Sequence, residues 1–168
     1  SLLKGTLPEN DKPIDELISD FDKEVLQVDK TVTKDALNNV HGDWYEWILA
    51  ISAWNYCAEN KSANLALLTP NISQFDIARL YNDKLYNLIQ DLRDKVLKSS
   101  SVQLISSNPD FVIIDRKVVD SAIKKIKPIK NVDQEVILLI ENSFRELSGK
   151  CDFDDILGYV SVKTSFRP

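Results

Sequence analysis

The sequence predicts an α/β domain in which helices flank a mixed sheet and the N-terminal half is rich in helix. Segments of the first 100 residues repeat apolar side chains every three to four positions, as amphipathic helices do. Residues 111–114, FVII, form an uninterrupted apolar run that is typical of a strand buried on both faces. Residues 160–163, VSVK, alternate apolar and polar side chains, as a half-exposed strand does.

The composition bounds the kind of protein. With 168 residues, 43% of them hydrophobic and 28% charged, the chain suits a single domain, 1–168, with a substantial apolar core. We expect residues 1–100 to be mainly helical and residues 101–168 to form a strand-helix-strand part. No apolar run has the length of a membrane span, and two widely spaced cysteines, Cys57 and Cys151, suit a reducing compartment. We therefore expect a cytoplasmic protein without a membrane partner.

In the helical part, apolar spacing predicts a helix over 14–28 and a short helical turn capped by Thr33 or Asp35. A second helix is predicted over 44–60, with Gly42 or Asp43 near its N-cap. The sequence Thr-Pro-Asn at 69–71 then breaks the chain, and a long helix is predicted over 73–98.

The second part reads as strands around one helix. A strand is predicted to begin at 102–105, and 116–120 is predicted to continue a strand or to turn. An amphipathic helix is predicted over 131–148, with Gly149 as its C-cap, followed by a loop over 151–155. A basic segment lies between residues 116–120 and the 131–148 helix. Its lysines, Lys124, Lys125, Lys127 and Lys130, either contact DNA phosphates or form a solvated loop.

Glu46 is the unusual residue of the predicted 44–60 helix. At 100° per residue it aligns with Ala50, Ala53 and Cys57, a stripe of small residues that another backbone can approach closely. No Lys or Arg follows it at i+3 or i+4. Either Glu46 meets a distant arginine or solvent, or it is a carboxylate that faces a functional site. The single histidine, His41, is interpreted as a capping or surface residue.

An acid and a lysine stand at the two predicted strands. Pro109 marks the entrance to the 111–114 strand and holds Asp110 at its mouth, whereas Ser161 and Lys163 share one face of the later strand. If the strands are neighbours, Lys163 reaches Asp110. Separately, each feature has an ordinary explanation, because lysines at strand ends are commonly solvated.

Together these features resemble the catalytic core of the PD-(D/E)XK nucleases. The run KTSFRP at 163–168 resembles the K-x-[ST]-x-R-x-D-R run of the type II restriction endonucleases that cut targets with a CCGG core. That family also carries a serine in place of the acid of D/E-x-K, as Ser161 does, and adds a glutamate on an upstream helix, where Glu46 stands. The resemblance implies a restriction-endonuclease-like catalytic domain, incomplete in this chain.

The resemblance implies magnesium-dependent hydrolysis of double-stranded DNA at a CCGG-containing site by a homodimer or homotetramer. In this view Asp110 and Glu46 bind Mg²⁺, and Lys163 and Ser161 complete the catalytic set. The residues expected to contact DNA are Arg167, Ser165 and Thr164, of which Arg167 reads guanine.

Two observations weigh against a complete nuclease. The net charge is −5, although residues 116–168 hold 10 basic and 8 acidic side chains and the first 115 residues hold 11 and 18. The chain also stops within the motif, before the expected Asp-Arg and a second metal-binding glutamate, so we infer a truncated, inactive fragment. The alternatives are a non-catalytic DNA-binding or assembly module and a purely structural helical domain.

Overall fold

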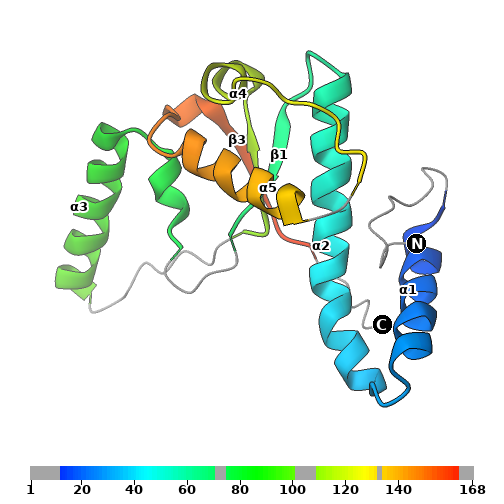
Figure 1. Ribbon diagram of the computed structural model, residues 1–168. Helices are drawn as coiled ribbons and strands as arrows, with labels where there is room; N and C mark the ends of the chain where they lie inside the picture. The colour runs from blue at the N-terminus through cyan, green and yellow to red at the C-terminus, as the bar shows by residue number, and fades with distance from the viewer. Residues whose placement is uncertain (1–11, 71–74, 101–108, 132–133, 163–168) are drawn as a thin grey trace.

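The computed structural model describes residues 12–70, 75–100, 109–131 and 134–162 (Figure 1). Within these ranges lie five α-helices, three strands and two short 3₁₀ helices. In chain order they are α1 (Ile14–Val28), α2 (Lys34–Glu59), β1 (Leu65–Leu68), η2 (Ile77–Leu80), α3 (Asp83–Ser100), β2 (Phe111–Ile114), α4 (Arg116–Ala122), α5 (Gln134–Leu147), η3 (Phe153–Asp155) and β3 (Ile156–Val160). None of the helices described is long and apolar enough to cross a membrane.

The strands form one sheet in the order β1-β2-β3, with antiparallel pairing throughout. The sequence predicted a mixed sheet, and the part of the chain that the structure describes contains only its antiparallel ladders. Leu67 lies opposite Val112 in the β1–β2 ladder, and Phe111 lies opposite Val160 in the β2–β3 ladder. The predicted strand at 111–114 is confirmed as β2, whose residues Phe111, Val112 and Ile114 are buried.

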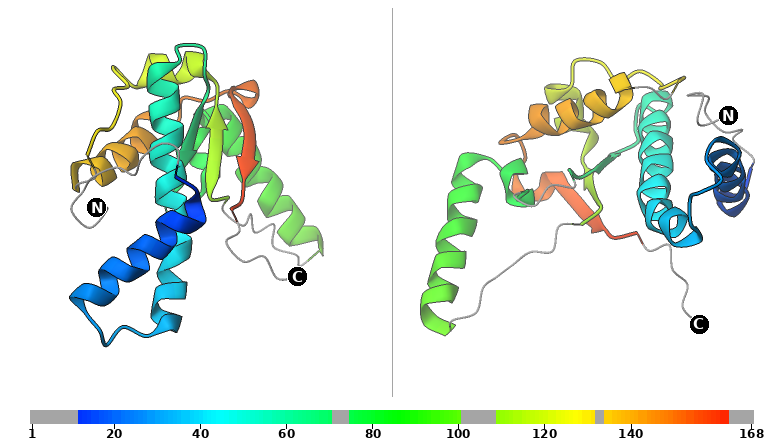
Figure 2. Two further views of the ribbon diagram at one scale, coloured as in Figure 1. Left: turned by 90° about the vertical axis from the view of Figure 1, so that its right-hand side faces the viewer. Right: turned by 60° about the horizontal axis from the view of Figure 1, so that its bottom comes forward.

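Helices cover the sheet around β1, which contacts both α2 and α5 (Figures 1 and 2). α4 lies beside α5 at one end of the sheet. A continuous core joins these elements through side chains that are almost wholly buried, among them Trp54, Leu65, Ile114, Val119 and Leu147. The strands are therefore anchored on a packed helical layer, which gives the residues at their ends fixed positions.

The predicted helix boundary at Gly42 and Asp43 is wrong, because a single helix, α2, runs from Lys34 to Glu59 through both residues. Thr33 is its N-cap, with the hydroxyl accepting a hydrogen bond from the N–H of Ala36. Glycine costs a helix interior only about 1 kcal/mol relative to alanine, and packing against α1 offsets that cost.

The N-terminal half of α2 packs against α1, whose predicted range of 14–28 is confirmed. The rings of Phe21 and Trp44 lie with centroids 3.6 Å apart, and Nε2 of His41 is 2.7 Å from a carboxylate oxygen of Asp22. His41 therefore joins two helices as a half-buried residue, instead of capping one or lying on the surface. The C-terminal half of α2 packs against the sheet at β1.

Two further expectations are corrected. The helix predicted over 73–98 begins only at Asp83, because η2 and the extended residue Tyr81 precede it. The strand or turn predicted over 116–120 is α4, capped by the Asp115 carboxylate, which accepts from the N–H of Lys117. Residues 65–68, which the sequence analysis left unassigned, form β1. The strand predicted to begin at 102–105 lies outside the described residues.

The helix predicted over 131–148 is observed as α5, Gln134–Leu147. Gly149 lies just beyond its end, with a φ of 73° that glycine readily adopts. The N–H of Gly149 donates to the carbonyl of Arg79, which ties the end of α5 to η2. The loop predicted over 151–155 contains η3 and leads directly into β3.

Candidate functional site

Asp110 lies immediately before β2, at the end of the sheet where β2 begins and where β1 and β3 end. The antiparallel register pairs Leu68 of β1 and Val160 of β3 with Phe111, so the residues that follow those two strands flank Asp110. On one side the N–H of Thr69 donates to the Asp110 carbonyl at 2.9 Å. On the other side the N–H of Val162 donates to Oδ2 of the Asp110 carboxylate at 2.5 Å. Asp110 is thus held by both of its neighbours.

Glu46 projects from α2 and is partly buried. Loss of solvent raises the pKa of its carboxyl group, and the negative charges of Asp110 and then Asp43 raise it further. Glu46 and Asp110 therefore lie close enough for their charges to repel. Neither forms an ion pair with a lysine, arginine or histidine in the described part of the chain.

The stripe of small residues in line with Glu46 leads into the core. Ala50 is 2% exposed and Cys57 is fully buried, in the half of α2 that contacts β1. Their small side chains allow the helix to approach the sheet closely. This approach brings the Glu46 carboxylate toward the end of the sheet that holds Asp110.

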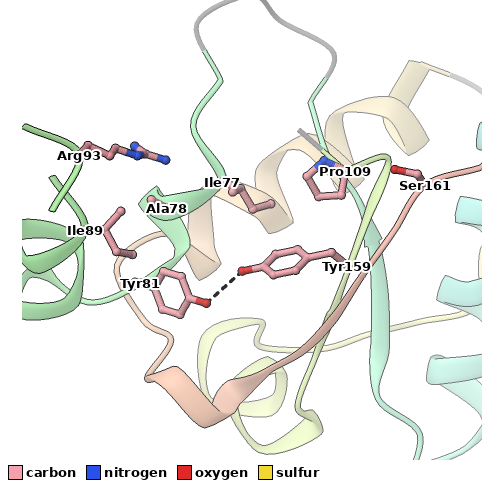
Figure 3. Close-up of a pocket in the computed structure, with 8 residues that line it drawn as sticks. All are labelled: Ile77, Ala78, Tyr81, Ile89, Arg93, Pro109, Tyr159 and Ser161. Carbon is pink, nitrogen blue, oxygen red and sulfur yellow. Dashed lines mark hydrogen bonds between the residues drawn. The ribbon is translucent and has the colours of Figure 1, made fainter. Parts of the chain in front are cut away.

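A pocket of about 420 Å³ opens beside this end of the sheet (Figure 3). Pro109 and Ser161 lie at one end of it and Arg93 at the other, where its guanidinium forms a bidentate ion pair with Asp76. Along its wall the hydroxyl groups of Tyr81 and Tyr159 lie 3.0 Å apart. Burial, followed by this hydrogen bond, raises the pKa of Tyr159. The pocket is therefore lined by uncharged side chains next to Asp110 and closed by an arginine that is already paired.

Ser161 is exposed and lines the pocket with Tyr159. The strand predicted over 160–163 is corrected, because β3 ends at Val160 and Ser161 directly follows it. The remaining predicted site residues, Lys163, Thr164, Ser165 and Arg167, lie outside the described residues. The distance from Lys163 to Asp110 therefore stays a prediction, although Val162, the residue before Lys163, is hydrogen-bonded to Asp110.

Comparison with known proteins identifies the family. A model of the Cfr10I/Bse634I restriction endonuclease family matches residues 5–168. The chain belongs to this family. The type II restriction enzyme Cfr10I of Citrobacter freundii is 34% identical over 149 residues, which cover 86% of this chain and 52% of that enzyme.

Solved structures of relatives agree with the assignment. The structure of the type IIF restriction endonuclease Bse634I with cognate DNA superposes with a TM-score of 0.80 at 28% identity, covering 98% of this chain and 58% of that one. A second Bse634I structure gives a TM-score of 0.77 at 29% identity, over 92% of this chain and 55% of that one. The chain spans only about half the length of these relatives. The family predicted from the KTSFRP run and the Pro-Asp strand is therefore confirmed.

The residues present suit a hard divalent cation in their chemistry but do not complete a site. Glu46 and Asp110 lie close enough for their charges to repel, and no described residue forms an ion pair with either of them. Carboxylate oxygens are ligands that Mg²⁺ prefers. Within the described ranges, however, no group of three or more His, Cys, Asp or Glu side chains is arranged to hold a metal ion. Glu46 and Asp110 would supply part of a ligand set.

The sequence analysis missed Thr69, which contacts the backbone on both sides of the Pro109–Asp110 peptide bond. The available signal was the apolar run LALL at 65–68, ended by Thr-Pro, which is typical of a short buried strand. A strand there would have suggested a neighbour for the 111–114 strand. The hydrogen bond between Thr69 and Pro109 joins residues 40 positions apart, so local sequence patterns do not predict it.

Proposed function

We propose that the protein containing this chain is a type II restriction endonuclease that cleaves double-stranded DNA at a CCGG-containing site in the cytoplasm. The observation that carries the proposal is the pair of like-charged carboxylates, Glu46 and Asp110, at the end of the sheet. Isolated carboxylates without a cation are costly in a partly buried site, and a divalent metal ion offsets that cost. Membership of the Cfr10I/Bse634I family supports the same conclusion.

Each residue has a role in phosphodiester hydrolysis. Asp110 and Glu46 would hold Mg²⁺, which supplies charge neutralisation of the phosphate and activation of water. Lys163, one residue beyond the N–H that binds Asp110, would orient the attacking water and stabilise charge developing on the phosphate. Ser161 stands beside them without a charge of its own.

The proposed partner is duplex DNA. Bse634I has been crystallised with its cognate DNA, and the superposition of that structure on this chain supports the same kind of ligand here. We propose a homodimer or homotetramer, because a palindromic target presents the same bases to two symmetric subunits. Thr164, Ser165 and Arg167 would lie on the DNA side of Lys163.

Arg167 is proposed to read guanine in the major groove. Its planar guanidinium matches O6 and N7 of guanine, a contact worth roughly 1–3 kcal/mol of discrimination. In the full-length protein that contains this sequence, Arg167→Ala should weaken binding to CCGG duplexes far more than to unrelated duplexes. An equal loss for all sequences, with a reduced salt dependence, would show that Arg167 contacts only phosphates.

The test of the reaction also uses the full-length protein. Plasmid DNA with CCGG-containing sites should be cut in the presence of Mg²⁺, and Asp110→Asn, Glu46→Gln and Lys163→Ala should each reduce the single-turnover rate at least 100-fold. A matched control is Asp43→Asn, an exposed acid three residues before Glu46, which should cut within a few-fold of the wild type. Undiminished cleavage by Asp110→Asn would refute the assignment.

For residues 1–168 alone the second candidate is a non-catalytic DNA-binding or assembly module. We expect the isolated chain not to cut DNA, since a cation with two fixed carboxylates is held too weakly against the phosphate. Discrete Mg²⁺-dependent cleavage by this chain, abolished by Asp110→Asn, would overturn that expectation.

A further inference from the structure

Thr69 is an unusual residue because it is polar and buried. Only two polar side chains are buried in the described part of the chain, Thr69 at 7% exposure and Ser143 at 2%. Ser143 lies within α5, where its hydroxyl donates to the carbonyl of Leu139 one turn earlier. Thr69 instead directs its hydroxyl to another strand, at the place where the chain enters β2.

The hydroxyl of Thr69 binds the peptide that precedes Asp110. Its Oγ1 donates to the Pro109 carbonyl at 2.5 Å and lies 3.3 Å from the Asp110 carbonyl. The backbone N–H of Thr69 donates to the Asp110 carbonyl at 2.9 Å. Thr69 therefore binds the carbonyl groups of both Pro109 and Asp110. These bonds fix the backbone on both sides of the Asp110 Cα and so restrict the direction of its side chain.

The two contacts of Thr69 are not equivalent. The backbone bond to Asp110 continues the β1–β2 ladder, so any residue other than proline makes it. The bond to Pro109 requires a side-chain hydroxyl, and no other described residue donates to that carbonyl. Pro109 is itself buried, so its carbonyl would otherwise lack a partner, at a cost of about 1–3 kcal/mol.

The carboxylate of Asp110 is oriented from the opposite side. Val162 donates its N–H to Oδ2, whereas no described residue donates to Oδ1. Thr69 holds the main chain of Asp110, and Val162 holds Oδ2 of its carboxylate. Together these hydrogen bonds fix the direction in which Oδ1 points. Such support matters because metal ligands bind well only when neighbouring groups hold them in place.

We propose that Thr69 is a positioning residue that, through its hydroxyl bond to the Pro109 carbonyl, orients Asp110 for binding a divalent cation. This inference rests on the proposed function, in which Asp110 is a metal ligand. Removing the hydroxyl leaves the Pro109 carbonyl to rotate toward water, and the Asp110 carboxylate turns with that peptide. The consequence is weaker metal binding in a protein whose fold is otherwise retained.

The experiment measures Mn²⁺ binding to the full-length protein that contains this chain, by electron paramagnetic resonance of the free ion. Thr69→Val keeps the shape of the side chain but removes the hydroxyl, and it should raise the dissociation constant for Mn²⁺ about 10–100-fold. Thr69→Ser keeps the hydroxyl and should stay within about threefold of the wild type. Asp110→Asn should abolish binding and so defines the site.

Ser143→Ala is the matched control, because it removes the other buried hydroxyl, whose hydrogen bond lies within α5. It should lower the melting temperature without changing Mn²⁺ affinity, which separates a loss of stability from a loss of positioning. If Thr69→Val does not fold, Thr69→Ala serves instead, since it places no methyl group against the Pro109 carbonyl. Its expected loss of affinity is the same.

The outcomes are distinguishable. Equal Mn²⁺ affinity in Thr69→Val and the wild type, with binding still lost in Asp110→Asn, overturns the role of Thr69 and leaves the metal site intact. An equal loss in Thr69→Ser and Thr69→Val also overturns it, because the hydroxyl would then be irrelevant. Absence of binding by the wild-type full-length protein, or binding that Asp110→Asn retains, counts against the proposed metal site itself.

Discussion

The C-terminal end and the middle of α2 differ in how their polar side chains are paired. Near its C-terminal end, Trp54 donates its indole N–H to the carbonyl of Lys127 at 2.9 Å. Asn55 both donates to the carbonyl of Ile129 and accepts from its N–H. Near the middle of the helix, Glu46 is partly buried beside two further carboxylates, without a cation in the described residues.

The difference separates a structural region from a candidate functional one. Where the helix only holds the fold, each buried polar group has a partner, because an unpaired one destabilises the folded state. Glu46 is only partly buried, but burial and its like-charged neighbours raise its pKa, and groups perturbed in this way concentrate at binding and catalytic sites. Substitutions in the two regions should therefore change the free energy of unfolding with opposite signs.

The largest effect is expected at Trp54, which is 1% exposed and lies in the core against the sheet. Trp54→Ala should lower the free energy of unfolding by about 3–5 kcal/mol, since it leaves a large cavity. Urea denaturation followed by circular dichroism measures the change. Tyr56→Ala removes a neighbouring aromatic ring that is 63% exposed, and should cost far less. Similar losses at the two positions would contradict the packing of this end of α2.

Asn55 should show the next largest effect. Asn55→Ala removes both hydrogen bonds to Ile129 and leaves its backbone groups unpaired, a loss of about 1–3 kcal/mol in the free energy of unfolding. The control Asn38→Ala changes an exposed residue of the same helix and should stay within about 0.5 kcal/mol. If Asn55→Ala were as silent as Asn38→Ala, the segment before α5 would not be held by α2.

Glu46→Gln should instead stabilise the protein at neutral pH. The raised pKa means that ionised Glu46 disfavours the folded state, and the penalty is absent below the unfolded pKa and grows as the pH rises through the folded pKa. We expect a melting temperature at pH 7 higher by about 2 °C, with no difference below about pH 4.

Magnesium provides a second measurement for Glu46. Millimolar Mg²⁺ should raise the melting temperature of the wild type at pH 7 and have little effect on Glu46→Gln, because binding to the folded state stabilises it. Glu59→Gln, a change at an exposed carboxylate of the same helix, should respond to Mg²⁺ as the wild type does. A destabilised Glu46→Gln would mean that the carboxylate has a partner outside the described residues.

The smallest effect is expected from the basic cluster, Lys124, Lys125, Lys127 and Lys130, all of which are exposed. Their segment is attached to α2 by Trp54 and Asn55. At about 100° per residue these two residues lie about 80° and 180° around the helix from Glu46, so the segment lies away from the side that carries Glu46. Of the two interpretations, the solvated loop is therefore favoured. Replacing all four by Gln should change the free energy of unfolding by less than about 0.5 kcal/mol.

The same variant tests DNA binding. Affinity for a short CCGG duplex, measured against salt concentration, should keep the wild-type slope, because a lysine that contacts no phosphate releases no counterion. Replacing Lys84, Lys95 and Lys98 of α3 by Gln changes a comparable number of exposed charges and controls for net charge. A slope reduced only in the first variant would restore the phosphate-binding interpretation.

Local sequence patterns predicted the elements whose packing agrees with their periodicity. α1 and α5 have one apolar face each, and β2 is a short apolar run between Asp110 and Asp115, so the expected ranges lie close to the observed ones. The prediction failed where tertiary contacts outweigh local signals. Gly42 lies within α2 because α1 supports the helix on both sides of it, and 116–122 is a helix because Asp115 caps it.

By itself the sequence determined the family, through the spacing of Asp110, Ser161 and Lys163 and the run that follows, because catalytic chemistry requires particular side chains in a particular order. Only the tertiary structure decided what surrounds them. Glu46 and Asp110 stand 64 positions apart in the chain, and Thr69 meets Pro109 across 40. Such contacts depend on strand pairing and on the close packing of α2 against β1, which local periodicity does not specify.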